Sequence, residues 1–109
     1  MSEARTHYKA GIEHFAAGQI DEAVASYRQA LALNEKMAMA WNGLAMALAK
    51  AGDLDAALDA ARRYAELDPD EPLAHTSLSM LYQQKGMIPE AEQEKAVSMQ
   101  LQMKQGGAR

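Results

Sequence analysis

The chain of 109 residues contains no cysteine. Neither a disulfide framework nor a metal site built from thiolates can therefore form. Long apolar runs are missing as well, because the longest, Leu44 to Ala49, is ended by Lys50. Such a run is far too short to span a bilayer, which takes about 20 apolar residues. The sequence therefore predicts no membrane-spanning segment, and the lack of cysteine fits a reducing compartment without requiring one.

Basic residues are outnumbered in this chain. The 11 Lys and Arg residues against 15 Asp and Glu residues give a formal net charge of −4, and the largest basic cluster is the pair Arg62-Arg63. A nucleic-acid-binding surface normally needs a basic stripe. The first residues, Met1 to Arg5, lack the apolar core of a signal peptide. We therefore expect a cytoplasmic protein whose partners include neither nucleic acid nor a membrane.

Motifs that carry chemistry are also missing. The sequence has no G-x-S-x-G, no phosphate-binding glycine loop and no H-E-x-x-H. His7 and His14 lie seven residues apart, which is about 10.5 Å along a helix, whereas two ligands of one zinc ion each lie about 2.1 Å from it. We interpret these two histidines and His75 as half-buried packing residues, and expect no catalysis, no metal and no cofactor.

A repeat is what the sequence does contain. Gly18, Gly52 and Gly86 follow one another at intervals of 34 residues. Three further columns keep the same interval: Ala23, Ala57 and Ala91; His7, Trp41 and His75; Leu33, Leu67 and Leu101. Four columns in one register indicate a structural repeat, and a period near 34 is typical of a helix-turn-helix unit.

The clearest copy of this unit lies between Trp41 and Pro69. It reads Trp41-x-x-Leu44-Ala45-x-x-Leu48, then Gly52, then Ala57-x-x-x-Ala61, then Pro69. This spacing resembles the tetratricopeptide repeat, W-x2-L-G-x2-Y followed by A-x3-F and P. The resemblance implies an all-α fold, a right-handed α-solenoid of three such repeats. We expect one domain over 1–109, with repeats at 4–37, 38–71 and 72–105 and a frayed tail at 106–109.

Local signals agree with this plan. Ser2 is a plausible N-cap of a first helix that runs to about Ala17, and Asp53 or Asp55 can cap the fourth helix. Each repeat glycine supplies the left-handed conformation that commonly follows a helix. Pro72 suits the first turn of the fifth helix.

Four positions depart from the family pattern. The family places a large aromatic residue where Ala61 stands and a small one where Tyr64 stands, so the two sizes are exchanged and local packing is expected to differ. Lys95 and Ser98 are polar where repeat one has Tyr27 and Ala30. Those columns touch the following repeat in the family, so we expect the last helix to serve as its own cap.

The family resemblance also implies a binding surface. The first helix of each repeat lines a concave groove through positions spaced three and four apart, which share one helix face. In this chain they are Arg5, Tyr8, Ile12, Phe15, Met39, Asn42, Met46, Ala49, Leu73, Thr76, Met80 and Gln83. The set is largely apolar, and methionine suits adaptable binding surfaces. Alternatively, some of these side chains pack against neighbouring helices or a second copy of the chain.

Some relatives grip the C-terminal carboxylates of chaperones with lysine, arginine and asparagine. The matching positions here hold Tyr8, Ile12, Gly43, Leu73 and Ser77, so that specificity is not expected. The sequence predicts a non-catalytic scaffold or adaptor that binds an apolar or amphipathic peptide in its groove. The alternative is a structural protein that forms homo-oligomers through the groove or the solenoid ends. We further expect Trp41 to be largely buried between the two helices of its repeat, near Leu58.

Overall fold

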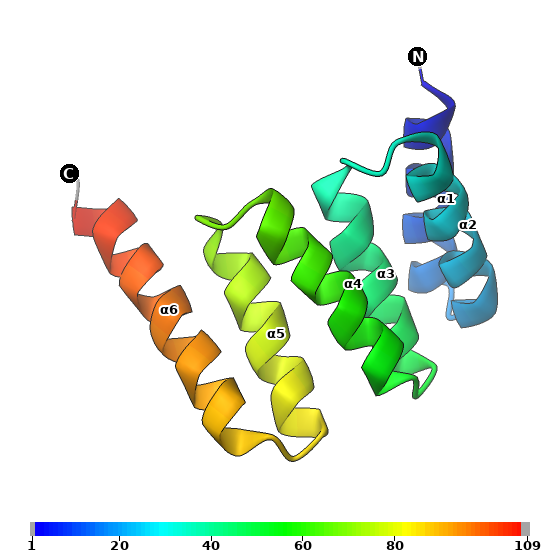
Figure 1. Ribbon diagram of the computed structural model, residues 1–109. Helices are drawn as coiled ribbons and strands as arrows, with labels where there is room; N and C mark the ends of the chain where they lie inside the picture. Colours follow the sequence, from blue (N-terminus) through cyan, green and yellow to red (C-terminus); the bar gives the residue numbers. More distant parts are fainter. Residues whose placement is uncertain (1, 108–109) are drawn as a thin grey trace.

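The computed structural model describes residues 2–107. All regular structure in this part of the chain is α-helical, which confirms the predicted fold class. The elements are α1 (Glu3–Ala16), α2 (Ile20–Leu33), α3 (Ala38–Lys50), α4 (Leu54–Leu67), α5 (Pro72–Gln84) and α6 (Ile88–Gly107). Successive helices pack as hairpins, and the array runs from α1 at one end to α6 at the other (Figure 1). Six helices accommodate three helix-turn-helix repeats.

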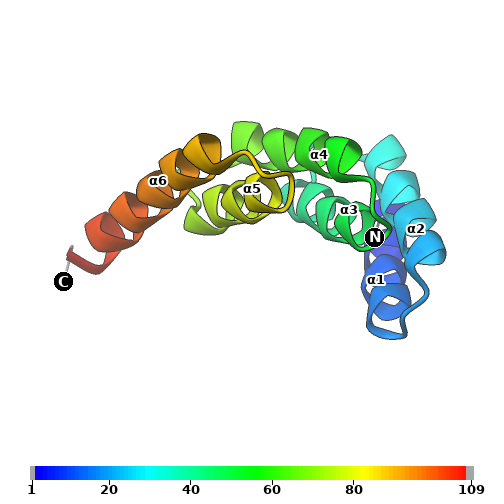
Figure 2. The ribbon, with the colours of Figure 1, turned by 90° about the horizontal axis from the view of Figure 1, so that it is seen from below.

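The helices form a curved array of two layers. Seen along the helices, α1, α3 and α5 lie on the inner side of the arc and α2, α4 and α6 on the outer side (Figure 2). Besides its hairpin partner and its neighbour along the chain, α3 contacts α1 and α5, whereas α2, α4 and α6 do not contact one another. The shortest dimension of the molecule is 22 Å, which is about two helix diameters. The inner layer is therefore continuous, and the outer layer is open between its helices.

Each repeat glycine ends the first helix of its hairpin in the predicted conformation. Gly18, Gly52 and Gly86 have φ values of 80°, 92° and 80°. After α3, the Gly52 N–H donates to the Ala49 carbonyl (3.0 Å) and the Asp53 N–H donates to the Leu48 carbonyl (2.9 Å). These two bonds form a Schellman motif, which satisfies carbonyls that the helix end leaves free.

Side chains at the helix starts complete the plan. The Ser2 hydroxyl accepts from the Arg5 N–H, and the Asp53 carboxylate accepts from the Ala56 N–H, each at 3.2 Å. Pro72 is the first residue of α5. The predicted caps at Ser2 and Asp53 and the predicted place of Pro72 are confirmed.

The last helix is longer than expected. It runs to Gly107, beyond the predicted end of the third repeat at residue 105. Gly106 and Gly107 are helical, and Ala108 and Arg109 lie outside the described residues. Fraying of the tail at 106–109 therefore stays a prediction, as do the repeat boundaries.

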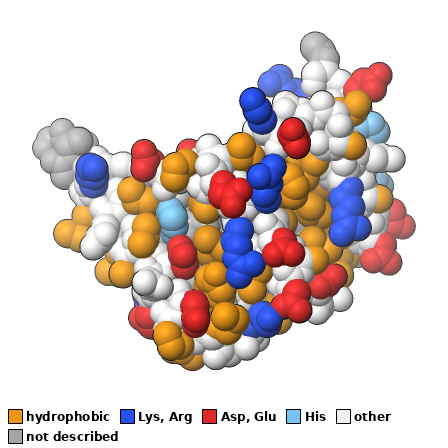
Figure 3. Space-filling model, viewed as in Figure 1, with side chains coloured by type: hydrophobic (Ala, Val, Ile, Leu, Met, Phe, Trp, Pro, Cys, Tyr) orange, Lys and Arg blue, Asp and Glu red, His pale blue; other side chains and the backbone are white. Residues whose placement is uncertain are grey.

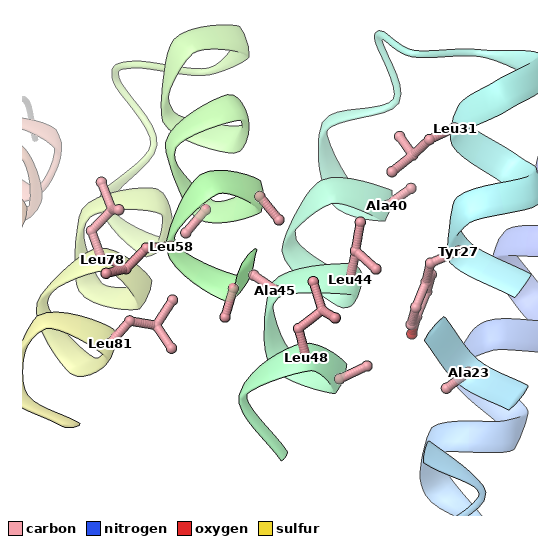
Figure 4. Close-up of a cluster of buried hydrophobic side chains, with 14 of the residues drawn as sticks. Ala23, Tyr27, Leu31, Ala40, Leu44, Ala45, Leu48, Leu58, Leu78 and Leu81 are labelled. Atoms are coloured by element: carbon pink, nitrogen blue, oxygen red, sulfur yellow. The ribbon is translucent and has the colours of Figure 1, made fainter. Parts of the chain in front are cut away.

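The core runs through the whole array, between the two layers (Figure 4). At its N-terminal end the Tyr27 ring, only 4% exposed, takes the space left by two glycines. A Cβ at Gly11 would lie 2.7 Å from this ring, and one at Gly43 would lie 2.5 Å from it. α1, α2 and α3 approach closely here because neither glycine has a side chain.

The exchanged sizes at Ala61 and Tyr64 are accommodated in the core. Both residues are fully buried, and the Tyr64 hydroxyl lies 3.7 Å from the Met39 sulfur on α3. At the equivalent position of α6, the buried Ser98 hydroxyl donates to the Pro72 carbonyl (3.1 Å) and lies 2.7 Å from the Thr76 hydroxyl. The same column thus connects the helices of a hairpin by an aromatic side chain in repeat two and by hydrogen bonds in repeat three.

Candidate functional site

The groove residues predicted from the sequence lie on α1, α3 and α5, which form the inner side of the arc (Figure 2). Four large apolar side chains among them are exposed by 42–45%: Ile12, Met39, Leu73 and Met80. Arg5 and Gln83 are also exposed, and Tyr8, Phe15, Asn42, Met46, Ala49 and Thr76 are half-buried. These exposed apolar side chains are not needed to fill the core. Exposed apolar surfaces of this kind commonly mark an interaction site.

Four of the predicted residues meet in one hollow. Phe15 of α1, Met46 of α3 and Met80 of α5 line a space of about 440 Å³, together with Ala49, Lys50, Leu81 and Gln84. The sequence prediction did not include the last three of these. Lys50 lies four residues after Met46 and so shares its helix face, which was the available signal. The hollow combines an apolar floor with an ammonium group and an amide.

A second hollow of about 330 Å³ lies between α5 and α6. It is lined by Thr76, Ser79, Met80, Gln83, Lys95, Ser98, Met99 and Gln102. Met80 therefore faces both spaces. Neither hollow is lined by the remaining predicted residues: Arg5, Tyr8, Ile12, Met39, Asn42 and Leu73.

Some groove residues already have partners inside the molecule. The Asn42 side-chain oxygen accepts from the Ser77 hydroxyl at 3.0 Å, which leaves the amide NH₂ of Asn42 as a donor. The Tyr8 ring lies 6.0 Å from the Tyr27 ring at a tilt of 51°. Burial, followed by the influence of Tyr8, raises the pKa of Tyr27 above its ordinary value. Tyr8 and Asn42 are thus held in place by the core.

The three histidines are half-buried, as predicted. His75 has two acceptors: Nδ1 lies 2.8 Å from the Glu94 carboxylate and Nε2 lies 2.8 Å from the Pro69 carbonyl. Burial lowers the pKa of His75, but the bonds to Glu94 and Pro69 and the charges of Glu94 and Asp70 outweigh it, so the pKa is raised. Only the imidazolium form can donate from both ring nitrogens. This link between α5, α6 and the preceding turn was not predicted.

The sequence predicts that Trp41 is largely buried near Leu58. The indole is half-buried and packs against the core cluster that contains Leu58. Its Nε1 donates to the Glu35 carbonyl at 2.8 Å, and the Arg63 guanidinium lies 5.3 Å from the ring centre. The N–H needs an acceptor when it is withdrawn from water. The Glu35 carbonyl precedes α3, and this bond keeps the indole at the outer surface.

Within residues 2–107, no three His, Asp or Glu side chains come together as ligands of one ion. None of the helices in that range combines the length and the apolar character needed to cross a bilayer.

Solved structures share this architecture. A crystal structure of MamA superposes with a TM-score of 0.91 over 95% of this chain and 61% of the MamA chain, at 24% identity. This chain therefore spans about three fifths of that protein. The second tetratricopeptide domain of Spaghetti (RPAP3), bound to the HSP90 peptide SRMEEVD, superposes with a TM-score of 0.87 over 92% of this chain and 93% of that one, at 21% identity. A chain of the CopN–Scc3 complex gives 0.86 over 93% and 61%, at 19% identity.

These identities establish the fold alone, and no curated protein matches the sequence. A sequence profile described as tetratricopeptide repeat matches residues 8–72, which is more than half of the chain. Together with the repeated glycines and the helix hairpins, this match shows that the chain belongs to the tetratricopeptide repeat family.

Proposed function

We propose that this chain is a non-catalytic protein-interaction module, which binds an apolar or amphipathic peptide segment in the groove formed by α1, α3 and α5. The observation that carries the proposal is the hollow in which Phe15, Met46 and Met80 converge from three helices. A peptide side chain seated there would contact all three repeats at once. Methionine side chains adapt to differently shaped partners, which suits such a surface.

The charge pattern favours apolar recognition over a carboxylate clamp. Two structures of Spaghetti (RPAP3) domains hold an HSP90 peptide that ends in EEVD. Here Gly43 faces Tyr27, and the Ser77 hydroxyl is bonded to Asn42. Neither position presents a basic group. Lys50 is the charged group at the hollow lined by Phe15, Met46 and Met80. A single ion pair at an exposed site adds little to the binding free energy.

A selected peptide gives the sharpest test. A library of random peptides would be selected against the chain, and a labelled winner would be titrated by fluorescence anisotropy. We expect Met46→Glu with Met80→Glu to abolish binding, because the two carboxylates would replace the apolar floor of the hollow. Helix content by circular dichroism should stay unchanged, since neither side chain is fully buried.

Salt provides an independent check. Screening weakens charge pairs and leaves apolar burial intact, so affinity should survive at high salt. Collapse of the affinity with salt, or binding that persists in the double variant, contradicts the groove proposal. A molecular mass that rises with concentration and falls back in the double variant would instead support a homo-oligomer joined through the groove.

A further inference from the structure

A further hollow region lies on the outer face of the array, opposite the groove. Here α2 and α4 do not contact each other, and α3 forms the floor between them. Two adjoining spaces of about 350 and 310 Å³ share Arg28, Trp41 and Leu44 as lining residues. On this face, hydrophobic side chains gather between α2 and α4, with basic side chains on both sides of them (Figure 3). We call the larger space the outer hollow.

Repeat two leaves this space open because two of its side chains are small. Ala56 and Ala60 line the outer hollow from α4, and 34 residues later the same columns hold Glu90 and Glu94. In repeat three Glu94 reaches across to His75, at 2.8 Å. Trp41 occupies the same column as His75. Ala60, which lies opposite Trp41, has no group that could reach across.

The floor of the outer hollow is apolar and well supported. Leu44 and Leu48 are 5% and 6% exposed and line it from α3. Trp41 forms one side, and its ring is held in place by the bond to the Glu35 carbonyl and by the Arg63 guanidinium. A large apolar side chain from outside would therefore meet a fixed indole and two leucines without any rearrangement.

The charges around the outer hollow indicate which charged group a ligand should carry beside its apolar side chain. Its acidic lining residue, Asp59, is bonded to Arg62 at 3.2 Å, and the Arg63 guanidinium pairs with Glu66 at 3.2 Å. Arg28 forms no ion pair with any residue in the range 2–107. The unmatched charge at this site is a guanidinium, and its natural complement is a carboxylate.

We propose that the outer hollow is a second protein-docking site, which takes a large apolar side chain from a partner segment that carries a carboxylate beside it. The apolar group packs on Trp41, Leu44 and Leu48, and the carboxylate pairs with Arg28. Tryptophan and arginine are the residue types that most often dominate protein interfaces. This site is independent of the groove, so one chain could hold two partners on opposite faces.

Trp41 is the only tryptophan, so its fluorescence reports directly on this site. Three blocked dipeptides serve as probes, each with a phenylalanine preceded by aspartate, asparagine or lysine. We expect the aspartate probe to bind about two- to fivefold more tightly than the asparagine probe, as an exposed ion pair allows. The lysine probe should bind most weakly. Arg28→Gln should remove the preference for aspartate, and Arg28→Lys should retain part of it.

Filling the outer hollow with a larger side chain tests the proposed apolar contact. Ala60→Gln should abolish binding of all three probes, and Ala96→Gln, the same change at an exposed position of α6, should have no effect. If Ala60→Gln unfolds the chain, Ala56→Gln at the half-buried end of the hollow replaces it. The Met46→Glu, Met80→Glu variant should lose groove binding and keep the response of Trp41.

Equal affinity for the three probes, or a preference that survives Arg28→Gln, overturns the carboxylate assignment. Binding that persists in Ala60→Gln, or in Ala56→Gln where that variant replaces it, overturns the site itself. A mass that rises with concentration in the wild type and not in Arg28→Gln overturns the assignment to a partner protein, because the occupant would then be a second copy of this chain.

Discussion

The Tyr27 ring lies so close to Gly43 that a Cβ added at this glycine would be 2.5 Å from the Cζ atom of the ring. The contact joins α2 to α3, and so ties repeat one to repeat two. Because a buried ring cannot move aside without disturbing its other neighbours, the absence of a side chain at position 43 is a packing requirement.

Gly43→Ala should therefore destabilise the chain. Overpacking costs about 1–3 kcal/mol, which exceeds the gain of about 0.5–1 kcal/mol that alanine brings to a helix interior. Urea denaturation would measure the change. Gly106→Ala is the matched control, because a Cβ there meets no atom within 4 Å, and it should be neutral or slightly stabilising. A Gly43→Ala variant as stable as the wild type would contradict the packing described.

Gly52 tests backbone strain without a clash. Its φ is 92°, and an added Cβ would meet nothing within 4 Å. Gly52→Val should cost roughly 1 kcal/mol or more, because a β-branched residue is strained at positive φ. Gly52→Asn should cost less, since asparagine tolerates this region. Equal thermal midpoints for the valine variant and the wild type would argue against the assigned turn.

The link between His75 and Glu94 makes stability depend on pH. The pKa of His75 is raised in the folded chain, so the folded state binds its proton more tightly than the unfolded state does. Its contribution is fully present below the unfolded pKa of about 6.5 and is lost as the pH rises through the folded value. The free energy of unfolding should thus fall between about pH 6 and pH 8.

Glu94→Gln should flatten this dependence, because the neutral amide no longer favours the imidazolium. Chemical denaturation at both pH values would compare the variant with the wild type. His7→Gln is the control, since it removes a half-buried histidine that makes no ion pair within residues 2–107. Parallel curves for wild type and Glu94→Gln would refute the assignment.

Trp41 is expected to stabilise the fold through its N–H as well as through its ring. Trp41→Phe removes the bond to the Glu35 carbonyl and should cost about 0.5–1.5 kcal/mol from that bond alone. Arg63→Gln keeps the bond and loses the stacked cation, worth about 0.5–1 kcal/mol at an exposed site, together with the exposed ion pair to Glu66. Emission of the folded wild type should be partly accessible to a water-soluble quencher. An indole fully protected from quenching would disagree with its half-buried place.

The glycine column shows what could be predicted from sequence. Gly18, Gly52 and Gly86 recur in register, and their positive φ follows from local backbone chemistry, so no knowledge of tertiary contacts was needed. The place of Ser2 and Asp53 at helix starts follows in the same way.

Trp41 shows where this reasoning ends. Its column predicts a packed residue, but the depth of burial depends on which side chains of the neighbouring helix cover it. In repeat three Glu94 bonds to His75, and in repeat two Ala60 has no polar group that could bond to Trp41. Such contacts combine residues from separate columns, and the repeat pattern treats each column alone. For the same reason, Arg28 and Arg63 were not recognised as parts of one surface.

The contact pattern also bears on how the chain folds. No helix contacts another that is more than two elements away, so contacts stay between near neighbours in the chain, which favours rapid folding. Each hairpin depends only on its neighbours, and unfolding can begin at either end. The α3–α4 hairpin is covered on both sides, whereas α1–α2 and α5–α6 are covered on one. The amide protons of α3 and α4 should therefore exchange with solvent last.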